Sequence, residues 1–173
     1  MKFLSLIATS ISDINRAIGR LISWSTLLLV ILVFVLAVLR YAFKIGSIPL
    51  QETVLYLFSI VFMFGASYTL ADDGHVRVDM LYNNYSKQKR AWVNLLGTVF
   101  LLIPVCLLII ETSYGYVKIS WAIGESSGEA GGLPYLYLFK SLLLIMPVLL
   151  MLQGLAVIMQ SIITLQNRDS EHD

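Results

Sequence analysis

The chain has 173 residues, of which 58% are hydrophobic and only 13% charged, and its mean hydropathy is +0.80. A soluble domain carries about a quarter charged residues, so this composition indicates a protein that resides in lipid. The formal charge of +1 gives no electrostatic reason to expect nucleic acid or an acidic partner. The single cysteine, Cys106, excludes an internal disulfide and argues against membrane oxidoreductases that need paired thiols. Both histidines, His75 and His172, fall in polar stretches, so we expect no haem, metal or other cofactor in this chain.

Four segments are long and apolar enough to cross a bilayer as helices, which takes about 20 residues each. The sequence therefore predicts a single all-α membrane domain over 1–173, with spans near 21–39, 50–70, 92–114 and 135–159. The first span is long for a signal peptide and no small-residue cleavage site follows it, so we interpret it as a retained helix. Pro104 and Pro147 lie inside the third and fourth spans, where kinks are tolerated if neighbouring groups satisfy the freed carbonyls.

The distribution of Lys and Arg predicts the direction of the spans. Eight of these residues fall on one side and four on the other: Lys2, Arg16, Arg20, Arg77, Lys87, Lys89, Arg90 and Arg168 against Arg40, Lys44, Lys118 and Lys140. We therefore expect both termini in the cytoplasm. Between the second and third spans, apolar residues recur at helical spacing, which predicts a short amphipathic helix in the headgroup plane over about 76–85. A plain polar linker is the alternative.

The middle of every predicted span is apolar, whereas a transporter that works alone needs polar groups there. At about 1.5 Å per residue, Glu52, Glu111 and Lys140 fall toward the outer interface. They would share this layer with Arg40, either as a cluster that fixes packing or docking, or as separately solvated charges. The pattern disfavours small multidrug transporters and intramembrane enzymes. It favours a scaffold, an anchor or an accessory subunit.

Several motifs carry a more specific signal. They are Arg40-Tyr41-Ala42-Phe43, Leu50-Gln51-Glu52, Phe64-Gly65-Ala66-Ser67-Tyr68-Thr69-Leu70 and Asp73-Gly74-His75-Val76-Arg77-Val78-Asp79. Together they resemble the small, Q-type (DctQ-like) membrane subunit of tripartite ATP-independent periplasmic (TRAP) transporters. Farther on, Ser120-Trp121, Glu125-Ser126-Ser127-Gly128-Glu129 and Gly131-Gly132-Leu133-Pro134 resemble one branch of that family, so the resemblance covers nearly the whole chain.

The resemblance implies a small permease subunit in the bacterial inner membrane. Its implied partners are a large M-type membrane subunit, which carries the sodium and substrate sites, and a periplasmic protein that delivers an organic acid. The small subunit would pack against the stationary scaffold of the large one and contribute to docking of the binding protein. Structural or subunit-interface candidates are Arg40, Tyr41, Glu52, Gly65, Gly74, His75, Asp79, Glu111 and Lys140. Docking candidates are Lys44, Lys118, Glu125, Ser127 and Glu129.

Two other hypotheses remain open from the sequence. One is an autonomous small transporter that acts as an oligomer, which transport assays on the isolated chain would reveal. The other is a membrane anchor for a respiratory enzyme, which a cofactor spectrum in the purified complex would support.

Overall fold

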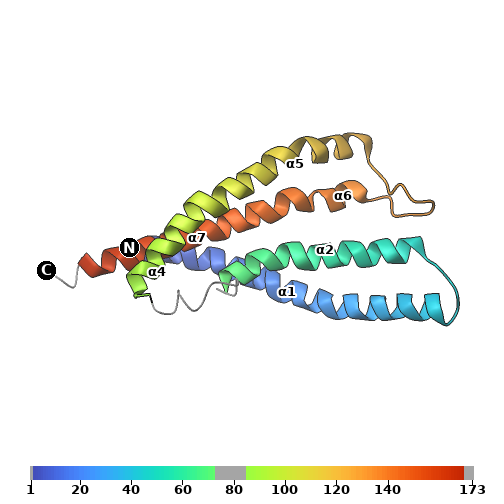
Figure 1. Ribbon diagram of the computed structural model, residues 1–173, viewed down its shortest axis with the longest axis horizontal. Coiled ribbons are helices and arrows are strands. Elements are labelled where there is room, and N and C mark those ends of the chain that lie inside the picture. The colour runs from blue at the N-terminus through green and yellow to red at the C-terminus, as the bar shows by residue number, and fades with distance from the viewer. Residues whose placement is uncertain (1, 73–84, 170–173) are drawn as a thin grey trace.

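A computed structural model describes residues 2–72 and 85–169 of the chain. Four helices in these parts are long and apolar enough to cross a membrane, which confirms the predicted number of spans. They form two hairpins, one from the first two helices and one from the last two (Figure 1). Both hairpin loops lie at one end of the molecule and the two termini lie toward the other (Figure 1).

The first helix, α1, runs from Lys2 to Tyr41 and is much longer than the predicted span. Its N-terminal half has a buried seam at spacings of three and four residues, made by Ala8, Ser12, Asn15, Gly19 and Ile22. Such a seam packs helices at a shallow angle, and its small residues let the backbones approach closely. Most apolar side chains of the C-terminal half are exposed, where that half runs beside α2 (Figure 1).

The second helix, α2, runs from Ile48 to Ala71. The Ser47 hydroxyl caps its first turn by accepting a hydrogen bond from the backbone N–H of Leu50. Near its other end the ring of Tyr68 lies directly over Gly19, where any side chain would overlap it. Glycine at that position therefore allows α1 and α2 to approach closely.

The third span is one continuous helical stretch from Lys87 to Ile123. It consists of α4 (Lys87–Gly97), a π-helical stretch (Thr98–Leu102) and α5 (Ile103–Ile123). The wider π turn comes directly before Pro104 and bonds the N–H of Ile103 to the carbonyl of Thr98. A π turn is one of the known ways in which a helix accommodates a local irregularity. At the far end, Gly124 has a φ of +57° and closes the helix, because glycine adopts this left-handed conformation without strain.

The fourth span consists of α6 (Leu136–Lys140) and α7 (Leu142–Asp169), separated at Ser141. Helix α7 lies centrally and contacts α1, α2, α4 and α5. Gly154 lies close to the third span, since a Cβ there would lie 2.6 Å from Leu102 Cδ2 and 3.1 Å from Thr98 Cγ2. The predicted interfacial helix falls outside the described residues except for Tyr85, and so do Gly74, His75 and Asp79.

Candidate functional site

The first polar layer lies at the end of the bundle that carries the hairpin loops, and Glu52 is at its centre. Glu52 lies near the start of α2, just after its first turn, and its carboxylate accepts a hydrogen bond from the Ser127 hydroxyl and one of 2.6 Å from the backbone N–H of Leu133. Gly132 is confined between them, because a Cβ there would overlap Ser127 and lie 2.9 Å from Glu52 Oε1. The loop between α5 and α6 is thus tied to the start of α2.

A second carboxylate in this loop is paired with the buried Lys140. Lys140 Nζ lies 2.5 Å from Glu125 Oε2 and 3.9 Å from the centroid of the Tyr116 ring. The Lys140 side chain is only 9% exposed, so the ion pair and the ring face replace much of its contact with water. The hydrogen bond from Lys140 lowers the pKa of the Glu125 carboxyl group, which therefore stays ionised.

Aromatic contacts complete this outer layer. The Trp121 indole N–H donates a 2.8 Å hydrogen bond to the Ser141 hydroxyl, and its ring meets Tyr137 edge to face. Tyr56 of α2 stacks on Phe139 of α6 with ring centroids 4.4 Å apart. Stacked and edge-to-face pairs add to the stabilisation gained from buried area alone. Together with the two carboxylate contacts, they join the loop, α2, α5 and α6.

The second polar layer lies at the opposite end, and its buried part is a chain of three side chains. Asn15 Nδ2 donates to Gln153 Oε1 at 2.9 Å, and Gln153 Nε2 donates to the Ser12 hydroxyl at 3.2 Å. All three side chains are buried. Because an unsatisfied polar group is costly inside a membrane bundle, these bonds fix α1 against α7.

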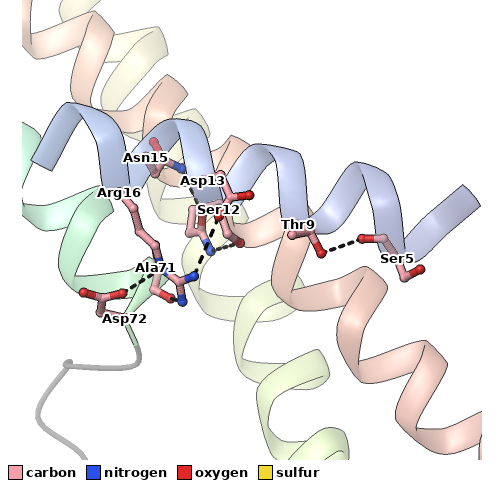
Figure 2. A network of polar contacts seen from close by, with 9 residues as sticks. Ser5, Thr9, Ser12, Asp13, Asn15, Arg16, Ala71 and Asp72 are labelled. Carbon is pink, nitrogen blue, oxygen red and sulfur yellow. Dashed lines mark hydrogen bonds and ion pairs between the residues drawn. The ribbon is translucent and has the colours of Figure 1, made fainter. Parts of the chain in front are cut away.

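An exposed ion pair continues this inner layer toward the end of α2, as Figure 2 shows. Arg16 Nε lies 2.8 Å from Asp72 Oδ1, and Arg16 Nη2 reaches the carbonyl oxygen of Ala71 at 3.4 Å. Hydrogen bonds from the Tyr68 hydroxyl and from Arg16 lower the pKa of the Asp72 carboxyl group. The end of α2 is therefore joined to α1 through a carboxylate that stays charged.

Between the two layers the described helices are almost free of charge. Glu52 and Asp72 are separated by roughly twenty residues of α2, or about 30 Å, which matches the hydrocarbon thickness of a bilayer. No Asp, Glu, Lys, Arg or His lies on α2 between them, nor on α7 between Leu142 and Gln166. The exception is Glu111, which sits on an exposed face of α5.

The structure brings together only some of the residues predicted from the sequence. Glu52 and Lys140 both belong to the outer layer, but each is bonded to the α5–α6 loop. Glu125 and Ser127, predicted as docking residues, supply those loop contacts. The others are exposed, namely Arg40, Tyr41, Lys44, Glu111, Lys118 and Glu129. No other part of the described chain stands against Gly65, since a Cβ there would meet nothing within 4 Å.

Sequence reasoning missed the seam of α1 that contains Ser12 and Asn15. The sequence does show small and polar residues at spacings of three and four in this segment. They lie before the apolar run that was used to locate the first span, so they were not considered as part of a helix interface. Among the described residues, no three His, Cys, Asp or Glu side chains gather in a way that would hold a metal ion.

These features define a class: a four-span helical membrane protein whose polar contacts lie at the two ends of its bundle. The chain belongs to the family described as tripartite ATP-independent periplasmic transporters, DctQ component, whose family model matches residues 29–164. A protein of Haemophilus influenzae named as a TRAP transporter small permease protein is 35% identical over 101 residues, which cover 58% of this chain. The match spans 62% of that relative's length. No solved structure matches the chain. The chain is thus a transporter subunit rather than an enzyme, and a multi-pass protein of the inner membrane.

Proposed function

We propose that the chain is the static small subunit of a sodium-coupled importer that receives organic acids from a periplasmic binding protein. In this proposal it braces a large transport subunit in the bilayer, with both of its own termini in the cytoplasm. The observation that carries the proposal is the apolar region between the two polar layers. An organic acid crossing this chain would need cationic or hydrogen-bonding groups at that depth, and α2 carries no charged residue between Glu52 and Asp72.

The sodium and substrate sites are assigned to the large subunit, as the family resemblance implies. Glu111 is the side chain of this chain that we assign to the subunit contact. A carboxylate on an exposed helix face near the hydrocarbon is costly unless a partner provides a donor or a cation. Glu111→Gln should therefore weaken assembly with the large subunit, whereas Lys118→Gln, farther toward the loop end of the same helix, should leave assembly intact.

The outer layer supports the docking part of the proposal. Glu52 and Lys140 hold the α5–α6 loop in one conformation, and Lys44, Lys118 and Glu129 remain exposed around it. A loop ordered before binding loses less conformational entropy when a partner docks. We assign Glu125 and Ser127 to ordering the loop and Glu129 to contacting the binding protein.

The test is reconstitution in liposomes with an imposed sodium gradient. Uptake of an organic acid should require three proteins: this chain, the large subunit and the binding protein. The isolated chain should give no uptake with or without the gradient. Uptake by the isolated chain would overturn the proposal and favour an autonomous transporter. A cofactor spectrum in the purified complex would instead favour an anchor for a respiratory enzyme.

A further inference from the structure

Glu111 lies in the third span between the two polar layers. The nearest outer-layer residue on its helix is Tyr116, about 8 Å away along the helix axis. In the opposite direction, about 14 Å away, Leu102 lies against Gly154 of α7, which directly follows Gln153 of the inner layer. Glu111 is deeper than its place in the predicted span suggested, because the third span continues well beyond its predicted end. Helical side chains point toward the start of their helix, and α5 starts on the inner side, so the Glu111 carboxylate is directed away from the outer layer.

Glu111 also faces away from the rest of the bundle. The buried side chains of α5 are Cys106, Val117 and Ser120. At 3.6 residues per turn, Glu111 projects roughly 120° to 180° away from these three. No ion pair or hydrogen bond joins its carboxylate to another described side chain. At membrane depth the carboxylate is therefore presented to a neighbour outside the described part of the chain.

The surroundings of Glu111 on this side of α5 suit contact with another helix. Leu107 and Leu108 share the same side and are 50% and 59% exposed. Gly115 follows one turn after Glu111, and a Cβ there would meet nothing within 4 Å, so the described packing of this chain does not require glycine at that position. A small residue on an exposed membrane helix lets a second helix approach closely. We call these four residues the Glu111 face.

The charge of Glu111 limits what can cover this face. Lipid tails offer neither a donor nor a cation, so an ionised carboxylate directed at them is strongly unfavourable. A second copy of this chain, related by a two-fold axis and oriented the same way in the membrane, would bring two Glu111 side chains together at one depth. Two carboxylates at that depth repel each other. A helix that carries a lysine or arginine at the same depth supplies the missing countercharge.

We propose that a membrane helix of the large subunit packs along the Glu111 face and places a lysine or arginine against the Glu111 carboxylate. The two helix backbones come closest at Gly115. The inference rests on the proposed function, because that function supplies the large subunit. It adds which face of this chain meets the large subunit and the chemistry of the residue that Glu111 meets.

The first test measures the affinity of the full chain for the purified large subunit in lipid nanodiscs. Glu111→Gln should weaken binding about thirtyfold, because the cation of the large subunit is left buried without its partner. Lys118→Gln is the matched control, since Lys118 is exposed farther along the same helix, and it should leave binding unchanged. Gly115→Leu should also weaken binding, whereas Gly97→Leu should not, because Gly97 lines a groove toward α7 and equally has open space. Circular dichroism verifies that each variant folds.

The second test exchanges the charges. Glu111→Lys should bind the large subunit more weakly than Glu111→Gln, since two cations then face each other. Each lysine and arginine in the membrane helices of the large subunit is replaced in turn by glutamate. One of these replacements should restore binding to Glu111→Lys and weaken binding to wild type.

The outcomes separate this inference from the proposed function. Undiminished binding by Glu111→Gln, an equal loss in Lys118→Gln, or failure of every charge exchange to restore binding would overturn the inference and leave the proposed function standing. If wild type did not bind the large subunit at all, the proposed function would fail and the inference with it.

Discussion

The buried bond between Asn15 and Gln153 allows a quantitative test of how α1 is held against α7. Replacing Gln153 by Leu puts an apolar side chain of similar size in place of the amide and removes two hydrogen bonds, to Asn15 and to Ser12. Interhelical hydrogen bonds in membrane proteins contribute about 0.6 kcal/mol on average and at most about 1.7, so two bonds give a loss of roughly 1 to 3 kcal/mol. The loss has a second source as well, since the buried amide of Asn15 is left without its partner.

The assay is a double-mutant cycle on the free energy of unfolding, measured by denaturant titration in micelles. Gln153→Leu and Asn15→Leu should each destabilise the chain. The double variant should be less destabilised than the sum of the two, because no buried amide of the pair is then left unsatisfied. Strictly additive losses would refute the reasoning, since they would mean that the two side chains do not interact in the membrane.

Three further outcomes are expected. Gly19→Leu should destabilise the chain by about 1 to 3 kcal/mol through overlap with the Tyr68 ring, and pairing it with Tyr68→Ala should recover part of the loss in the same titration. Gly124→Ala should cost about 1 kcal/mol, because alanine is strained at a φ of +57°, whereas Gly115→Ala in the same helix should be neutral or stabilising. The pKa of Asp72 is lowered, so its ionised form contributes stability above its ordinary pKa of 3.8, and this contribution is lost as the pH falls through the lower folded value. The free energy of unfolding of wild type should thus decrease at pH values below about 4. Asp72→Asn should remove that part of the decrease.

The apolar runs of the sequence alone determined the number of spans and their approximate places. A membrane-spanning helix forms its backbone hydrogen bonds within its own segment of about 20 apolar residues. The sequence pattern of a span is therefore local and can be recognised without knowing which helices lie beside it. The same local reasoning located the charged residues at the ends of the spans and recognised the motifs of the family. It could not find the start of α1 at Lys2, because residues 2–20 are mixed in polarity and the face that they bury is defined only by the neighbouring helices of the fold.

Which polar residues meet was decided only by the tertiary structure. The sequence grouped Glu52, Glu111, Lys140 and Arg40 by depth, but depth says nothing about which face of a helix a side chain occupies. In the fold, Glu52 and Lys140 turn toward the α5–α6 loop, whereas Glu111 and Arg40 remain exposed. The path of that loop depends on its glycines and on contacts far apart in the chain. The direction of the Glu111 face likewise depends on which side of α5 packs against α7, so no single segment of the sequence could have predicted it.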